Sequence, residues 1–160
     1  MSIILRDIKP EDNFELAHII RRAFEEFNAP QEGSVYSDHD TDHLYELFRE
    51  TGSCYFVAEE DGVLLGGCGV YPTTGLPEGY AELVKLYLSR ATRGKGIGKM
   101  LMKKCFEAAR ALNYKQLYLE SFPQFAKAIS LYEKDGFKSL AHPLGNSGHT
   151  ACTIWMIKNL

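Results

Sequence analysis

The stretch RGKGIGK, residues 93–99, places three glycines and three cations within seven residues. It follows a strand-like run, YAELVKLYLS (80–89), and precedes a helix-like run in which apolar residues recur at helical spacing from Ile97 to Leu112. Glycines let successive backbone N–H groups turn toward one point, and the first turn of a helix adds unpaired donors at the positive end of its dipole. The stretch predicts an anion-binding loop suited to a diphosphate, with a flexible basic loop as the alternative.

Spacing excludes two common phosphate-binding motifs. A dinucleotide fingerprint G-x-G-x-x-G counted from Gly94 and Gly96 places Lys99 where the third glycine belongs. A Walker loop requires GxxxxGK followed by Ser or Thr, but Arg93 and Met100 occupy the two flanking positions. The anion is therefore not expected to belong to a Rossmann-bound dinucleotide or a hydrolysed nucleoside triphosphate.

Hydrophobic periodicity and turn residues predict an alternation of strands and helices along the whole chain. The expected strands are 2–8, 54–60, 63–72, 80–89, 115–121, a strand from Phe137 and 150–158, and the expected helices are a first helix after Pro10, a short one over 41–50, a long one over 97–112 and one over 123–135. The strand–helix–strand unit around RGKGIGK predicts parallel pairing with a right-handed crossover. This places the loop at the carboxyl edge of the sheet, where ligands of α/β proteins usually bind.

Composition is ordinary for a single globular domain, which we expect to span 1–160. The formal net charge of −3 argues against a general nucleic-acid binder, and no apolar stretch approaches the roughly 20 residues of a membrane span. The cysteines are far apart and form no CxxC pair, which excludes a zinc knuckle and a redox dithiol; they are Cys54, Cys68, Cys105 and Cys152. Without a signal-peptide pattern at the N-terminus, a reducing, cytoplasmic location is predicted.

At this point the sequence resembles the GCN5-related N-acetyltransferase (GNAT) family, whose acetyl-CoA motif is Q/R-x-x-G-x-G/A after a bulged strand. Arg93, Gly96 and Gly98 match that motif, and ELVKLYL (82–88) and AISLYEKDGF (128–137) extend the match. The resemblance covers nearly half of the chain. It implies an α/β (α+β) fold with a mixed, mostly antiparallel sheet of about six to seven strands, about four flanking helices and a β-α-β acetyl-CoA unit.

The same resemblance assigns coenzyme contacts. The pyrophosphate of acetyl-CoA would bind the backbone amides of the motif, namely Arg93, Gly94, Lys95, Gly96, Ile97, Gly98 and Lys99. The pantetheine arm would pair with the backbone of Leu86, Tyr87 and Leu88, where one amide polarises the thioester carbonyl. Many family members carry Asn at the position of Phe125, so the resemblance does not extend to the contact with coenzyme or substrate that this Asn makes.

Two side chains are the candidate proton-transfer groups. An unperturbed amine has a pKa near ~10.4, so transfer requires a base or a proton wire, and Glu82 matches a glutamate that family members often use through water. The alternative for Glu82 is a solvated carboxylate at a strand end. Tyr132, in SLYEK, matches the family's general acid, since a phenol of pKa ~10 can protonate the leaving sulfur, and the alternative is a core tyrosine.

The predicted activity is direct acetyl transfer in a ternary complex, without a metal, to a small-molecule or peptide amine. Tyr71 and His149 are candidates for the acceptor pocket, and the acidic residues between Glu25 and Glu50 form either a rim that attracts a cationic amine or a solvated surface. A non-catalytic module that senses acyl-CoA is the alternative function. A homodimer is compatible with the resemblance.

Overall fold

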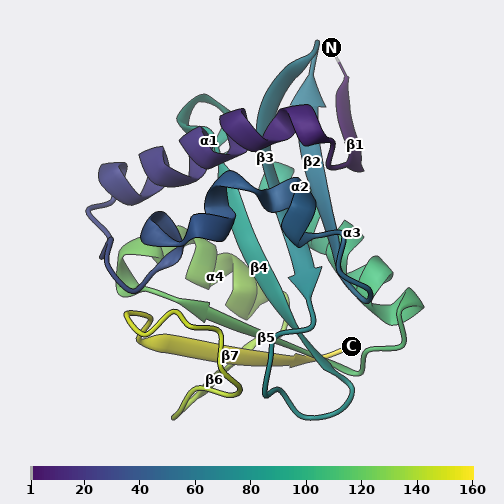
Figure 1. The fold of residues 1–160 in the computed structure, drawn as a ribbon, viewed down its shortest axis with the longest axis vertical. Helices are drawn as coiled ribbons and strands as arrows, with labels where there is room; N and C mark the ends of the chain where they lie inside the picture. The colour runs from purple at the N-terminus through teal and green to yellow at the C-terminus, as the bar shows by residue number, and fades with distance from the viewer. Residues whose placement is uncertain (1) are drawn as a thin grey trace.

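The computed structural model describes residues 2–160 and is built on one seven-stranded sheet in the order β1-β2-β3-β4-β5-β7-β6 (Figure 1). Neighbouring strands run antiparallel except for β4 and β5, which are parallel. The strands are β1 (Ile3–Asp7), β2 (Cys54–Glu60), β3 (Val63–Tyr71), β4 (Tyr80–Leu88), β5 (Gln116–Ser121), β6 (Lys138–Leu140) and β7 (Ile154–Asn159). The expected mixed, mostly antiparallel sheet is confirmed.

Helices cover both faces of the sheet (Figure 1). They are α1 (Asn13–Glu26) and α2 (Leu44–Leu47) on one face, and α3 (Ile97–Ala111) and α4 (Ala126–Lys134) on the other. Each face has its own apolar core: Phe24 and Val57 are fully buried on the α1 side, and Leu101 and Val70 on the α3 side. Burying each such side chain contributes about 1.5–3 kcal/mol. Among residues 2–160, no helix has the length and apolar character needed to cross a membrane.

Three element boundaries differ from the sequence-based expectation. The last strand begins at Ile154 rather than at residue 150, because Ala151 N–H donates to the Gly33 carbonyl outside the sheet. The short helix expected over 41–50 is only the single turn of α2, preceded by a 3-10 turn (His39–Asp42). The helix expected from residue 123 opens with a 3-10 turn (Pro123–Phe125) before α4.

Strands β4 and β5 diverge soon after they pair. Their pairing covers only Tyr80–Glu82 of β4, and β4 then carries a β-bulge at Lys85, whose φ is +55°. Glycines of β3 lie opposite the bulge, and a Cβ on Gly66 would come within 2.1 Å of the Tyr87 carbonyl oxygen. The glycine-rich run in β3 therefore lets β4 bulge. In the part of the chain that the structure describes, the edge of β4 that faces β5 has no strand partner over residues 83–88.

Candidate active site

The loop before α3 presents a row of free backbone donors. Gly94 and Gly96 have φ values of +82° and +77°, which glycine adopts without strain. The first helical hydrogen bond runs from Met100 N–H to the Gly96 carbonyl, at 3.1 Å. Within residues 2–160, no N–H from Gly94 to Lys99 has a hydrogen-bond acceptor. These donors lie at the positive end of the α3 dipole, which suits an anionic group such as a diphosphate.

The Arg93 side chain does not extend this row of donors, because it is bound to α1 and β4. Its guanidinium donates to both carboxylate oxygens of Glu26 at 2.6 Å and to the Leu88 carbonyl at 3.1 Å. It also lies over the Phe27 ring, 4.9 Å from the centroid. Arg93 therefore joins the end of α1 to the end of β4, while Lys95 and Lys99 are exposed.

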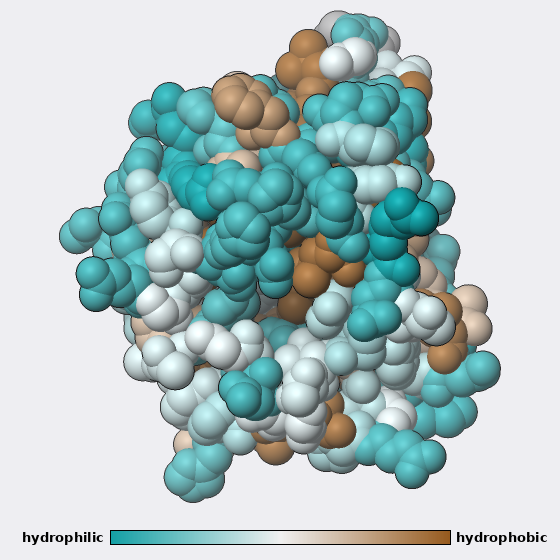
Figure 2. Space-filling model, viewed as in Figure 1, coloured by the Kyte–Doolittle hydropathy of each residue, from teal (hydrophilic) through white to brown (hydrophobic). Residues whose placement is uncertain are grey.

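A cavity opens where β4 and β5 diverge. One wall is formed by β4 from Glu82 to Tyr87, and the others include Glu120, Phe125, Tyr132 and His149. Figure 2 shows a hollow with an apolar floor near the centre of the face that carries α1 and α2. The cavity joins an apolar end, next to α4, to a polar end where carboxylates gather. It thus brings Glu82, Tyr132 and His149 together.

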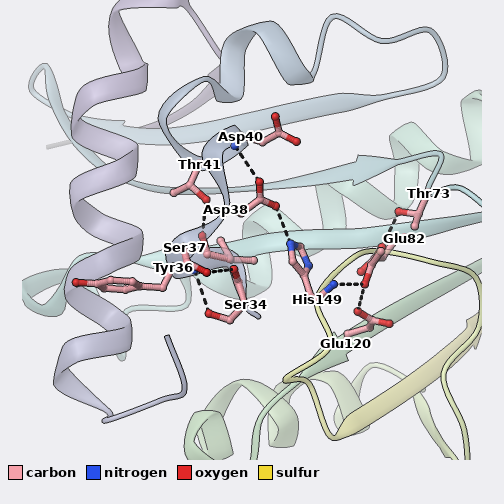
Figure 3. Close-up of polar contacts among 12 residues, drawn as sticks. Ser34, Tyr36, Ser37, Asp38, Asp40, Thr41, Thr73, Glu82, Glu120 and His149 are labelled. Atoms are coloured by element: carbon pink, nitrogen blue, oxygen red, sulfur yellow. Dashed lines mark hydrogen bonds and ion pairs between the residues drawn. The ribbon is translucent and has the colours of Figure 1, made fainter. Parts of the chain in front are cut away.

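Glu82 is buried, with 5% of its surface exposed, and lies at the polar end of the cavity (Figure 3). The Thr73 hydroxyl donates a 2.6 Å hydrogen bond to its Oε1 atom, and no group within residues 2–160 donates to Oε2. Burial raises the pKa of the Glu82 carboxyl to about 7; the Thr73 hydrogen bond opposes this rise and the nearby Glu120 charge adds to it. Such a carboxyl can accept a proton near neutral pH.

Tyr132 lies on α4 at the other end of the same cavity. It is 8% exposed, and its ring packs against Phe137 with centroids 5.8 Å apart. Burial raises the pKa of the Tyr132 phenol above its usual value of 10. This raised pKa keeps the phenol protonated at neutral pH. Its hydroxyl makes no hydrogen bond within the described part of the chain, so it is free to donate.

His149, a candidate for the acceptor pocket, lines the cavity and is held by a carboxylate from another loop. Its Nε2 atom lies 2.8 Å from Asp38 Oδ2, and 14% of its side chain is exposed (Figure 3). The hydrogen bond from His149 lowers the pKa of Asp38 to about 2, against the opposing effect of burial. This contact joins the loop before β7 to the segment before α2, and an Asn146 N–H bond to the Thr74 carbonyl, at 2.7 Å, ties in the β3–β4 loop. Three loops thus enclose the polar end of the cavity.

Two other expectations concern the acceptor site. Tyr71 is the cross-strand neighbour of Glu82, but it does not line the cavity and its ring instead packs against Phe48 at 5.7 Å. In the acidic segment between Glu25 and Glu50, Glu26 and Asp42 form ion pairs with Arg93 and Arg21. Glu25 and Glu46 accept hydrogen bonds from the neutral side chains of Tyr36 and Asn13, which leave their charge in place. An acidic rim that attracts a cationic amine stays a prediction for this segment, with a solvated surface as its alternative.

Sequence reasoning missed three polar residues around the cavity: Lys85, Glu120 and Asp38. Lys85 and Glu120 are charged residues within otherwise apolar strands, an arrangement that could have singled them out. Asp38 gave no such signal, because it lies among other acidic residues and its partner His149 is 111 positions away.

Comparison with known proteins identifies the family. The model of the acetyltransferase (GNAT) family matches residues 16–137. The uncharacterized N-acetyltransferase YjgM of Escherichia coli K12 is 35% identical over 160 residues, covering 99% of this chain and 96% of that protein.

Solved structures share the fold. A GNAT acetyltransferase from Staphylococcus aureus Mu50 superposes with a TM-score of 0.86 at 19% identity, covering 99% of both chains. The PaiA N-acetyltransferase of Thermoplasma acidophilum, solved in complex with coenzyme A, gives a TM-score of 0.78 at 22% identity over 100% of both chains. The predicted fold class and enzyme class are therefore confirmed, whereas the roles of individual site residues stay predictions. On the family match and the near full-length similarity to YjgM, this chain belongs to the GNAT family of acetyltransferases.

Proposed function

We propose that this N-acetyltransferase moves the acetyl group of acetyl-CoA directly to the amine of a small-molecule or peptide acceptor, in a ternary complex within the cavity between β4 and β5. The observation that carries the proposal is the pairing of Glu82, whose pKa is raised to about 7, with the protonated Tyr132 in one cavity. One group can accept a proton at neutral pH and the other can donate one. Residues 1–160 would form one catalytic domain.

The chain's own donors fit the coenzyme. The free N–H groups from Gly94 to Lys99 would hold its diphosphate, and the unpaired edge of β4 at Leu86, Tyr87 and Leu88 would hold the pantetheine arm. Phe125 packs edge-on against Phe24 at 5.3 Å, so it supplies an apolar wall in place of a polar contact. When bound, acetyl-CoA supplies an acetyl group activated as a thioester.

Glu82 would accept the proton of the acceptor amine, directly or through water, because no donor among the described residues, 2–160, binds its Oε2 atom. Tyr132 would give its hydroxyl proton to the leaving sulfur, whose thiol has an ordinary pKa of ~8.5. Burial keeps the pKa of Tyr132 high, so its proton stays on oxygen until the sulfur needs it. The two residues thus divide the proton transfers between the ends of one cavity.

The test is release of free CoA thiol from acetyl-CoA against a panel of amines, with mass spectrometry of the acetylated products. Amine-dependent thiol release with acetylated product supports the proposal. Tight binding of acetyl-CoA without amine-dependent release across the panel contradicts it and favours an acyl-CoA sensor. A peptide panel in the same assay separates small-molecule from peptide acceptors.

Location and assembly belong to the same proposal. All four cysteines are free thiols, and burial raises the pKa of both Cys54 and Cys152 to about 12. Thiols of this kind suit a reducing compartment, so we place the enzyme in the cytoplasm. A homodimer stays a prediction, which the molar mass in solution would test.

A further inference from the structure

Lys85 is a cation set into β4 beside the proposed base. It is half-buried and lines the cavity together with Glu82 and His149. Its φ of +55° lies in the left-handed region, which residues other than glycine rarely adopt, and such strain clusters at functional sites. The buried Tyr55 hydroxyl donates a 2.8 Å hydrogen bond to the Lys85 carbonyl, which fixes the bulge. The fold therefore holds this lysine at the cavity.

The carboxylates that line the cavity already have hydrogen-bond donors from the protein (Figure 3). Glu120 accepts from the Tyr118 hydroxyl at 2.6 Å and from the Ser147 hydroxyl at 2.5 Å. Glu82 accepts from the Thr73 hydroxyl at 2.6 Å. The protein therefore supplies donors to its own anions in this region.

The Lys85 ammonium, unlike these carboxylates, has no hydrogen-bond partner in the described chain. Within residues 2–160, its Nζ atom makes no hydrogen bond and no ion pair, so Asp38, Asp40 and Glu82 lie beyond direct contact. Burial lowers the pKa of Lys85, while the charges of Glu82, Asp38 and Asp40 oppose that change. A charged donor that is partly removed from water and left without a partner costs free energy, which an anionic ligand group would recover.

We infer that Lys85 binds a carboxylate of the acceptor, and that the acceptor is therefore a small amino acid acetylated at its amine. The inference rests on the proposed function, because it concerns the acceptor half of the same cavity. Glu82 would face the amine while Lys85 faces the carboxylate. A contact between the Lys85 ammonium and the acceptor's carboxylate is a charge-assisted hydrogen bond, which is stronger than a hydrogen bond between neutral groups.

Other amine classes fit this arrangement less well. A polyamine would bring further positive charge beside Lys85 and leave its ammonium unpaired, so like charges would repel within one cavity. The N-terminal residue of a peptide, which carries the amine, has an amide in place of its α-carboxylate and offers no charge to Lys85. Only an acceptor with both groups satisfies the base and the cation together.

The acceptor must also be short. Lys85 follows Glu82 by three positions on one strand, a separation of about 10 Å between Cα atoms at most, and both side chains line the same cavity. The amine and the carboxylate are thus joined by few bonds. Apolar side chains such as Val35, Phe122 and Cys152 complete the lining, which suits an acceptor with an apolar side chain.

The experiment uses matched acceptors that differ only in the carboxylate: phenylalanine with 2-phenylethylamine, leucine with 3-methylbutylamine, and every other standard amino acid with its amide. Beta-alanine and 4-aminobutyrate extend the separation of the two groups, and spermidine represents polyamines. Thiol release gives kcat/KM for each acceptor. Calorimetric titration of the same compounds into the protein with free CoA gives affinity without requiring chemistry.

Lys85→Met removes the charge but leaves the left-handed backbone strain as it is, Lys85→Arg keeps the charge, and the exposed Lys103→Met is the control for lost charge elsewhere. We expect the wild type to prefer the best amino acid over its decarboxylated partner by about 10- to 100-fold. In Lys85→Met that preference should vanish because the amino acid is used less well. The simple amine should change less, and only through the pKa of Glu82, which the Lys85 charge lowers. Lys85→Arg should retain most of the preference.

Equal use of both members of each pair by the wild type, or an equal loss for both in Lys85→Met, overturns the inference. Preference for spermidine or peptides over every amino acid overturns it as well. Amino acids that bind the wild type but not Lys85→Met, without any thiol release, would support the carboxylate site and refute the proposed catalysis. Acetyl transfer to simple amines alone would support the proposed catalysis and refute the carboxylate site.

Discussion

The Thr73 hydroxyl lies 2.6 Å from Glu82 Oε1 and donates to it, which leaves Glu82 Oε2 as the oxygen open to a substrate. The two residues come from the β3–β4 loop and from β4, so the hydrogen bond fixes the carboxyl at the polar end of the cavity. Because burial outweighs this hydrogen bond, the carboxyl keeps a pKa of about 7 and switches charge in the physiological range.

Activity should follow the charge of Glu82. We expect kcat/KM to rise with pH through a midpoint near the Glu82 pKa of about 7, because only the carboxylate accepts a proton. Glu82→Gln should lower kcat by about 10²-fold or more and abolish that rise. The measurement is thiol release from pH 5.5 to 9, and Glu78→Gln, at an exposed loop position, is the control. An unchanged pH profile in Glu82→Gln would remove Glu82 from the mechanism.

The same substitution should stabilise the protein at high pH. The folded-state pKa of Glu82, about 7, exceeds the ordinary 4.5, so its stability contribution is full below pH 4.5 and is lost as the pH rises through 7. Glutamine keeps an oxygen for the Thr73 bond and never ionises. From pH 4.5 to 8, Glu82→Gln should therefore gain about 3 kcal/mol in unfolding free energy relative to wild type, measured by urea denaturation. A difference in unfolding free energy between the two proteins that does not change with pH would show that burial does not raise the pKa of Glu82.

Removing the Tyr132 hydroxyl should separate chemistry from folding. Because the hydroxyl has no hydrogen-bond partner in residues 2–160, Tyr132→Phe should leave the free energy of unfolding and the affinity for acetyl-CoA nearly unchanged. Turnover should fall tenfold or more, since general acids contribute about 10²- to 10⁴-fold. Tyr114→Phe is the matched control: it loses a hydrogen bond to the Gly52 carbonyl and some stability, but no turnover. Equal turnover in Tyr132→Phe and wild type would make Tyr132 a core residue only.

The sequence predicts the features of this structure that depend on residues close together in the chain, and it does not predict contacts between residues far apart in it. Periodicity and glycine spacing are local, so β4, the loop and α3 could be located from residues 80–112 alone. The Glu26–Arg93 and Asp38–His149 contacts join positions 67 and 111 residues apart, and no local pattern encodes them. For the same reason the sequence gives no sign that α1 supplies a partner for the Arg93 side chain.

Two glycines of the loop should respond in opposite ways to alanine. Gly96 has a φ of +77° with open space around its missing Cβ, so Gly96→Ala should lose about 1–2 kcal/mol from backbone strain alone. Gly98 lies in the first turn of α3, and its Cβ would meet Leu131 at an ordinary 3.5 Å. Gly98→Ala should gain about 0.5–1 kcal/mol through the better helix propensity of alanine. Urea denaturation measures both, and equal losses would contradict this assignment.

The Glu26–Arg93 contact should act on coenzyme binding through the loop rather than by direct contact with the diphosphate. Arg93→Lys cannot reproduce the donors to both Glu26 oxygens and to the Leu88 carbonyl, so the loop should loosen and acetyl-CoA bind less tightly. Glu26→Gln is the deciding variant. If the contact positions the loop, Glu26→Gln should weaken acetyl-CoA binding, as Arg93→Lys does. The loss of binding free energy in the double variant should then be smaller than the sum of the two single losses. If the arginine instead bound the diphosphate, releasing it from Glu26 would tighten binding. Calorimetric titration of acetyl-CoA into the four proteins separates these outcomes, because the two accounts predict opposite signs for Glu26→Gln.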